Sequence, residues 1–251
     1  LFQVYNIQLL LDGDETFEEM ISTIQKAKHF ILLQMYIFRT DSMGTIFAET
    51  LMKKAKEGVK VYLLYERLGI KRSRTLLKRM KKSGIILGEF SPTKLNKLQL
   101  NFRNHRKLLL IDGEFGFWGG INIGDEYLGI SRRFSIPKKK QRNWRDTNIK
   151  ITGPLVKKAI LDFIRDWNFS HKNKTSFDLF FKQHLFDQTR KMSSQVCLEN
   201  TGPYESISSN LYQHIQLFNR AKFRLWIANP YVVPPQALVD SIPTYLPTYL
   251  P

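Results

Sequence analysis

The segment Phe30–Phe38 constrains the fold most, because it is almost wholly apolar and short. A short apolar segment of this kind is typical of a strand that is buried on both faces of a sheet. Comparable segments follow at Val59–Tyr65 and Ile85–Phe90. Between them we expect a helix over 43–57 that ends at Gly58 and a basic helix over 73–83 that ends at Gly84. Strands that alternate with helices predict a parallel sheet with right-handed crossover connections.

The neighbouring segments extend this unit to about residue 170. We expect a first helix capped by Asp14, and the dipeptide Asp112-Gly113 between two apolar stretches is a strong signal for a hairpin turn. The other elements expected here are strands over 107–112, 115–119 and 145–151 and a helix over 154–167. The predicted fold class is α/β, with a mixed and mostly parallel sheet flanked by helices.

A change in composition after residue 170 predicts the domain organisation. The expected parts are a first domain over 1–170, a polar linker over 171–192, the start of a second domain over 193–242 and a low-complexity tail over 243–251. Proline at every fourth position of the tail blocks both helix continuation and sheet pairing there.

The predicted second domain begins like the first. We expect strands at Val196–Leu198 and Phe223–Ala228, with a helix over 204–221 between them. Ala221-Lys222 comes just before the later strand, as Ala27-Lys28 comes just before the strand that starts at Phe30. This similarity favours an internal repeat of the same α/β unit.

The formal net charge of +17 favours anionic partners such as nucleic acid, anionic lipid headgroups or phosphorylated substrates. A solvated surface is the alternative explanation of this charge, but the basic residues cluster at 71–82 and 132–142, which favours a functional role. The single cysteine, Cys197, excludes a disulfide framework within the chain. The sequence has no uninterrupted run of about 18 apolar residues, so we expect no transmembrane helix in it. The chain opens at Leu1 without the features of a signal peptide, and we expect it to be a piece of a longer protein.

The strongest chemical signal is a set of residues at fixed spacing, namely His105, Lys107, Asp112, Gly120 and Asn122. His105 and Lys107 are two residues apart, so in a strand both side chains lie on the same face. The ammonium would neutralise charge on a phosphoryl group, and an imidazole with a free ring nitrogen would attack phosphorus. A glycine-rich turn ending at Asn122 would let backbone amides approach the same anion. A lone histidine at a strand edge is most often a surface residue, but this combination favours a catalytic one.

The pattern H-x-K-x4-D-x6-G-G-x-N resembles the signature of the phospholipase D superfamily. The segments similar to its bacterial cardiolipin synthase branch are 12–14, 34–38, 104–127, 144–147, 153–154 and 228–234. The resemblance implies a phospholipase D-like fold of two similar halves, each of which contributes one motif to a shared central site. It also implies a covalent phosphohistidine on one histidine, protonation of the leaving alcohol by the other, and no metal or other cofactor.

Residue by residue, the resemblance implies that His105 is a catalytic histidine and Lys107 a ligand of the phosphate. Gly120 and Asn122 match the phosphate-binding turn, and Asp112 matches the acid of the catalytic motif, with a role of structural support. In cardiolipin synthases a phosphatidyl group passes from one phosphatidylglycerol to another lipid alcohol, and glycerol leaves. The chain would then act at an anionic membrane surface, as a peripheral protein of the bacterial inner membrane.

A second H-x-K-x4-D pattern is absent from the sequence, so we expect one complete half and the opening of a second. Single-motif relatives pair two chains across a two-fold axis, which makes a homodimer an alternative route to a complete site. Three interpretations remain open: a truncated phosphatidyltransferase, a dimeric phosphodiesterase that acts on nucleic acid or hydrolyses phospholipid, and a non-enzymatic protein that binds anionic membranes.

Overall fold

A computed structural model describes residues 2–67, 69–70, 74–90, 104–128, 144–170, 194–196, 198, 209–227 and 234–242. Several parts of our predictions lie outside these residues. They are the basic segments 71–73 and 132–142, the linker 171–192, Cys197, the helix start 204–208, the segment 228–233 with the strand end at Ala228, and the tail 243–251. The chain divides into two compact units, Leu1–Leu198 and Glu199–Pro251. The domain boundaries given above stay a prediction.

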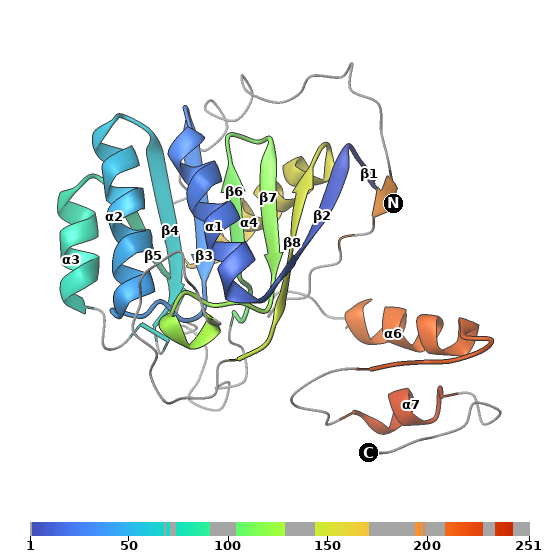
Figure 1. The fold of residues 1–251 in the computed structure, drawn as a ribbon. Coiled ribbons are helices and arrows are strands. Elements are labelled where there is room, and N and C mark those ends of the chain that lie inside the picture. The colour runs from blue at the N-terminus through green and yellow to red at the C-terminus, as the bar shows by residue number, and fades with distance from the viewer. Residues whose placement is uncertain are drawn as a thin grey trace. The chain divides into compact units, whose positions relative to one another are not determined.

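A seven-stranded sheet forms the centre of the first unit, in the order β2-β8-β7-β6-β3-β4-β5 (Figure 1). The strands are β2 (Asn6–Leu11), β3 (Phe30–Met35), β4 (Lys60–Glu66), β5 (Ile86–Phe90), β6 (Leu108–Ile111), β7 (Phe115–Gly119) and β8 (Thr147–Thr152). The pairs β3–β4 and β4–β5 are parallel, and the other four neighbouring pairs are antiparallel. The α/β class is confirmed, but the expectation of a mostly parallel sheet is wrong.

The β6–β7 hairpin explains the antiparallel half of the sheet. β6 pairs antiparallel with the central strand β3, with Leu109 opposite Leu33. The hairpin turn then reverses the chain at Asp112 and Gly113, both of which have positive φ angles, 53° and 71°. Because a hairpin always joins antiparallel strands, β7 runs antiparallel to β6. β8 then pairs antiparallel with β7, and β2 pairs antiparallel with β8.

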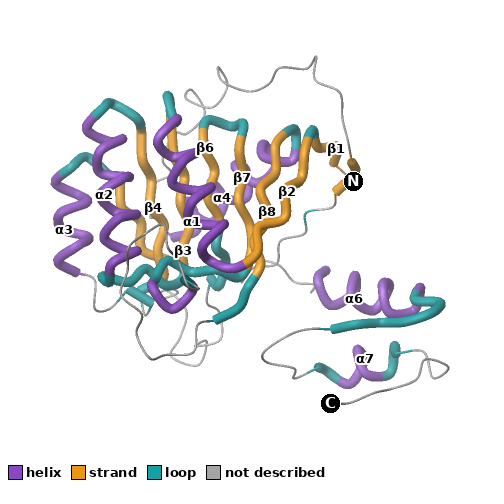
Figure 2. Tube along the Cα trace, in the orientation of Figure 1, coloured by secondary structure: helices purple, strands orange, loops and turns teal. Residues whose placement is uncertain are grey.

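Helices cover both faces of this sheet (Figure 2). The helices of the first unit are α1 (Asp12–Lys26), α2 (Ser42–Lys56), α3 (Arg74–Lys82) and α4 (Leu155–Ser170), with a short 3-10 helix η1 (Asp125–Tyr127). Buried residues of α1, α2 and α3 share one apolar cluster, whereas those of α4 belong to another that lies on the opposite face. The unit is therefore a three-layer α/β structure.

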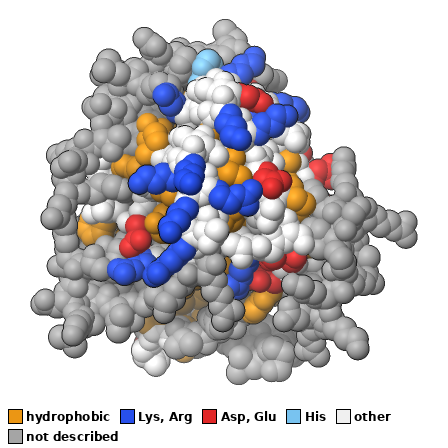
Figure 3. Space-filling view, turned by 90° about the vertical axis from the view of Figure 1, so that its left-hand side faces the viewer, with side chains coloured by type: hydrophobic (Ala, Val, Ile, Leu, Met, Phe, Trp, Pro, Cys, Tyr) orange, Lys and Arg blue, Asp and Glu red, His pale blue; other side chains and the backbone are white. Residues whose placement is uncertain are grey.

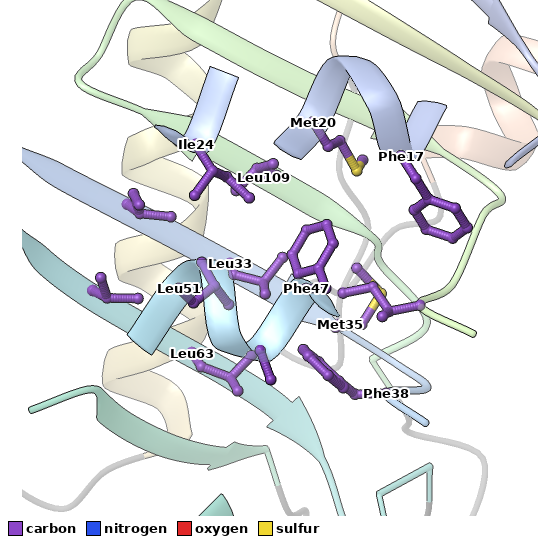
Figure 4. Packing of buried hydrophobic residues seen from close by; sticks show 14 of the residues in the cluster. Phe17, Met20, Ile24, Leu33, Met35, Phe38, Phe47, Leu51, Leu63 and Leu109 are labelled. Carbon is purple, nitrogen blue, oxygen red and sulfur yellow. The ribbon is translucent and has the colours of Figure 1, made fainter. Parts of the chain in front are cut away.

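The alternation along β3 explains why this strand lies at the centre. All six residues of β3 are buried. Ile31 and Leu33 pack into the cluster of α1, α2 and α3, where Figure 4 shows Leu33 close to Phe47 of α2. Phe30 and Leu32 pack on the other face, into the cluster of α4. A strand that buries both faces must have helices on both sides, as its continuous apolar sequence indicates.

The start of α1 differs from our expectation. The helix begins at Asp12 and its N-cap is Leu11, so the prediction that Asp14 caps it is wrong. The Leu11 N–H donates to the Glu15 carboxylate at 2.8 Å, while the Asp12 carboxylate accepts from the Asp146 N–H at 3.1 Å. Strand β2, which the sequence patterns did not indicate, thus turns into α1 directly beside the start of β8.

β1 (Phe2–Val4) pairs antiparallel with β9 (Ser194–Val196) in a separate two-stranded sheet. In the second unit, α6 (Ser209–Arg220) lies within the helix expected at 204–221, and α7 (Gln236–Val239) follows. The strand expected from Phe223 is wrong for the described residues 223–227, which form no strand. A strand needs a neighbour to pair with, and the described residues of this unit provide none. Within the described ranges, no helix is long and apolar enough to cross a membrane.

Candidate active site

The motif segment 104–107 lies at the carboxyl end of β3. It leads directly into β6, whose first residue, Leu108, is paired with Gln34 near the end of β3. The parallel strands β3 and β4 both end at this edge. In open α/β sheets, ligands bind at the carboxyl ends of parallel strands. The position of the segment is therefore that of a site.

Side chains of the segment alternate between two environments. His105 and Lys107 lie together, with 3.1 Å between Lys107 Nζ and His105 Nδ1, and Nζ also donates to the His105 carbonyl oxygen at 2.7 Å. Asn104 and Arg106 instead bind Asp166 of α4. The period-two alternation expected of a strand thus separates the pair at the site from a pair that faces a helix.

The ring of Tyr36 forms one wall of this pair. The centroids of the Tyr36 and His105 rings are 4.4 Å apart in an edge-on arrangement. Lys107 Nζ lies 5.2 Å from the centroid of the same tyrosine ring, within range of a cation–π contact. Tyr36 is the first residue after β3, so the end of the central strand directly supports the site.

Burial lowers the pKa of both residues. Lys107 is 6% exposed, and burial lowers the pKa of its ammonium to about 8, against an opposing effect of the Asp146 charge. The pKa of His105 is lowered too, first by partial burial of the ring and then by the Lys107 charge, although the residue as a whole remains exposed. Near pH 7 the pair is therefore a neutral imidazole beside an ammonium.

The turn after β7 fixes the other side of the site. Asn122 is buried, its side-chain oxygen accepts from the Ile37 N–H at 3.1 Å, and its amide nitrogen donates to the Tyr127 hydroxyl at 2.5 Å. A Cβ on Gly120 would lie 2.1 Å from a carboxylate oxygen of Asp146, so the glycine leaves room for that carboxylate. Asn122 therefore connects the turn to the segment that follows β3, and Gly120 leaves the space that the Asp146 carboxylate occupies.

The structure places Asp112 at the opposite end of β6 from His105. Its carboxylate accepts hydrogen bonds from the backbone N–H groups of Lys28, His29 and Phe30 at 2.7, 2.8 and 2.7 Å. These donors precede or begin β3, so Asp112 anchors the start of the central strand. It does not join the cluster of His105 and Lys107.

Three residues were given no role by the sequence argument: Tyr36, Asp146 and Asp166. Tyr36 and Asp146 do lie in segments similar to the cardiolipin synthase branch, which is a signal that could have found them. Asp166 lies far along the chain, on α4, and no local pattern links it to the motif. Across the described part of the chain, no three His, Cys, Asp or Glu side chains group as ligands for a metal ion.

Comparisons with known proteins bear on this arrangement. The sequence profile of the family described as "Cardiolipin synthase, PLD-like domain" matches residues 20–167. The chain is 38% identical over 239 residues to cardiolipin synthase 1 of Bacillus anthracis, in a match that covers 91% of this chain and 45% of that protein. The chain therefore spans less than half the length of this relative.

Two solved structures share the fold at low sequence identity. Phosphatidylserine synthase of Haemophilus influenzae matches with a TM-score of 0.61 and 17% identity, over 96% of this chain and 59% of that one. Nuc of Salmonella typhimurium, a phospholipase D family member, matches with a TM-score of 0.51 and 16% identity, over 68% of this chain and 99% of that one. At these identities the likeness concerns the fold alone.

Proposed function

Because the chain belongs to the family of the cardiolipin synthase, phospholipase D-like domain, we propose that it carries a catalytic half-site for phosphatidyl transfer. The substrate would be phosphatidylglycerol, and the products would be cardiolipin and glycerol. The observation that carries the proposal is the contact of 3.1 Å between the imidazole of His105 and the ammonium of Lys107. A neutral imidazole is a nucleophile for phosphorus, and a fixed cation stabilises the charge that develops on the phosphoryl oxygens.

In the proposed reaction, His105 attacks the phosphorus of the first lipid. An ammonium only donates hydrogen bonds, so His105 Nδ1 accepts from Lys107 at rest. A phosphoryl oxygen that takes over this hydrogen bond leaves a ring nitrogen free to form the P–N bond. The P–O bond to glycerol breaks, and the leaving oxygen takes a proton from a general acid. The hydroxyl of the second lipid then attacks phosphorus, breaks the P–N bond and returns a proton to the same group.

The general acid is proposed to lie outside the first unit. A histidine that bonds to phosphorus cannot protonate the leaving alcohol in the same step. Since the chain spans 45% of its relative, the further part of a longer chain is one source of the acid, and a second copy of this chain in a homodimer is the other. Mass measurement of the protein in solution, with and without detergent, distinguishes the two sources.

An anionic membrane surface is the proposed partner, and contact with the bacterial inner membrane is the proposed location. The charged residues of α3 are all basic, and all five are exposed: Arg74, Lys78, Arg79, Lys81 and Lys82. Figure 3 shows Lys and Arg side chains gathered on the side of the molecule where α3 lies. Each basic residue near an anionic bilayer contributes about 1 kcal/mol to binding, so this helix suits a surface rich in phosphatidylglycerol.

Phosphodiester hydrolysis of nucleic acid is a second candidate, favoured by the net charge of +17. The same two residues would serve it, with water in place of the lipid alcohol. One experiment separates the candidates. The full chain and His105→Ala are incubated with phosphatidylglycerol vesicles and, in parallel, with a single-stranded oligonucleotide, and the products are identified by mass spectrometry. Cardiolipin formed only by the unmutated chain supports transfer, whereas cleaved oligonucleotide without cardiolipin refutes it.

A further inference from the structure

Asp166 is a carboxylate of α4 that lies against the motif segment. It is 1% exposed, and its Oδ2 accepts from Gln34 Nε2 and from Asn104 Nδ2, each at 2.8 Å. The same oxygen forms an ion pair with the guanidinium of Arg106. A buried carboxylate is costly unless it is paired and hydrogen-bonded, and Asp166 has both kinds of partner.

Three partners of the Asp166 carboxylate come from the region of the motif. Asn104 and Arg106 are the two residues on either side of His105, and Gln34 is paired in the sheet with the first residue of β6. Each side chain therefore reaches from the edge of the active site to a single oxygen on a helix of the opposite layer. The Asn104 side-chain oxygen also accepts from the Arg106 N–H at 3.0 Å, which closes the backbone around His105.

The motif segment has little other support from secondary structure. Residues 104–107 belong to no strand, and the pairing of β6 with β3 and β7 starts only at Leu108. Backbone hydrogen bonds of the sheet thus do not fix the position of His105. The side-chain hydrogen bonds of Asn104 and Arg106 to Asp166 supply a restraint at that point.

We propose that Asp166 is a positioning residue, which holds the segment on either side of His105 so that the imidazole stays in contact with Lys107 at the site. This inference rests on the proposed function, because a fixed imidazole matters only if His105 reacts. A purely structural contact between α4 and the sheet would be served equally well by apolar residues, since they replace buried ion pairs at little cost in stability. Such a contact would not require three donors from the motif region to converge on one carboxylate oxygen.

The test uses the full chain with Asp166→Ala and Asp166→Asn, and Asp162→Ala is the matched control. Asp162 lies one turn earlier on α4, is also buried, and pairs with Lys158 and Arg165 of its own helix. The first readout is the pKa of His105 by NMR, assigned with His105→Gln. The second is the turnover number and KM of phosphatidyl transfer, and thermal unfolding reports stability.

We expect Asp166→Ala to reduce the turnover number about 100-fold, with KM changed less than about threefold, because a small displacement of a reacting group has an effect of this size. The pKa of His105 should rise toward its ordinary value, because the displaced ring becomes less buried and leaves its contact with Lys107. Asp166→Asn should lie between, and Asp162→Ala should change neither readout, even if it lowers stability as much. Equal values of turnover and His105 pKa in Asp166→Ala and Asp162→Ala would overturn the proposal.

A double variant guards against a result that reflects unfolding alone. Arg106→Met with Asp166→Leu replaces the ion pair by apolar side chains and is expected to restore stability without restoring turnover or the pKa of His105. Full recovery of both readouts would refute positioning. If the unmutated chain shows no transfer, a second copy of this chain does not supply the general acid, but the titration of His105 in the same variants still decides whether Asp166 holds the ring.

Discussion

At the start of β6, next to the motif segment, side-chain nitrogen atoms of Lys107 and His105 lie close to each other at an edge of the sheet. At the other end, the Asp112 carboxylate is saturated by three backbone N–H groups at the start of β3. Both ends belong to one sequence pattern. One, the proposed reactive end, has two groups with lowered pKa values, and the other, the anchor end, has a hydrogen-bonded carboxylate. A spacing pattern therefore combines residues with a proposed catalytic role and residues that stabilise the fold, and only the structure distinguishes the two kinds.

The largest expected effect is on activity at the reactive end. His105→Ala should lower phosphatidyl transfer at least about 10⁴-fold, because removing the nucleophile of a covalent mechanism removes most of the catalysis. Its midpoint of thermal unfolding should stay within about 2 °C of the unmutated protein, because the side chain is exposed and Lys107 also binds the backbone oxygen of residue 105. Lipid mass spectrometry and calorimetry measure the two quantities.

His214→Ala is the control for that substitution, because His214 is a histidine of α6 in the second unit. It should leave transfer unchanged. A midpoint of thermal unfolding in His105→Ala that falls far more than about 2 °C would contradict the comparison, in which one end of β6 supports activity and the other supports stability.

The anchor end should respond in the opposite way. Asp112→Ala leaves the N–H groups of Lys28, His29 and Phe30 without their acceptor and places alanine at a φ of 53°, so we expect a loss of about 3 kcal/mol in the free energy of unfolding. Urea unfolding measures this loss, and Asp112→Asn, which tolerates the left-handed conformation, should lose less. Activity per folded molecule should fall less than about tenfold. A fall as large as that of His105→Ala, with stability retained, would assign Asp112 to the chemistry.

The pH dependence sharpens the comparison further. Burial lowers the pKa of Lys107 from 10.5 to about 8, so between these values the unfolded chain binds a proton that the folded protein does not. Stability should therefore rise as pH increases through this window. The rate of transfer should fall about tenfold per pH unit above pH 8, since the ammonium is lost. Opposite slopes of stability and rate in the same buffers are the expected result.

Lys107→Arg is the control for the pH profile, because a guanidinium stays charged throughout this range. It should remove the fall in rate above pH 8, even if its overall activity is low. An unchanged alkaline limb in Lys107→Arg would assign the limb to another group.

The sequence predicted the contact of His105 with Lys107 better than the sheet around it. The motif spacing brought His105 and Lys107 together because strand periodicity is local. The distant contacts are different: Asp112 lies 82 residues along the chain from Phe30, and Asp166 lies 60 residues from Arg106. Periodicity contains no information about such distant partners, and it equally could not show that β6 would pair antiparallel with β3.

Two apolar segments show why strand patterns alone were insufficient. Phe30–Met35 is fully buried as β3 because it pairs with β4 and β6 on its two sides and helices pack against both of its faces. The similar segment that starts at Phe223 leaves Phe223 86% and Trp226 83% exposed, and no strand forms over its described residues. The local sequence is alike, so the difference comes from the neighbouring strands that the described part of the first unit provides.

The smallest effect we expect tests whether the carboxylate of Asp146 belongs to the reactive end. Gly120→Ala would place a Cβ 2.1 Å from an Asp146 oxygen, so that carboxylate must move away. Its charge opposes the lowering of the Lys107 pKa, hence its displacement should lower that pKa further and reduce transfer about fivefold to tenfold at pH 8. NMR titration of isotopically labelled lysine measures the pKa.

Gly119→Ala is the matched control, because its Cβ would meet Asn148 and the Thr147 backbone oxygen instead, and it should destabilise the turn without shifting the Lys107 titration. Equal shifts in both variants would mean that Lys107 senses the turn as a whole and not the Asp146 charge.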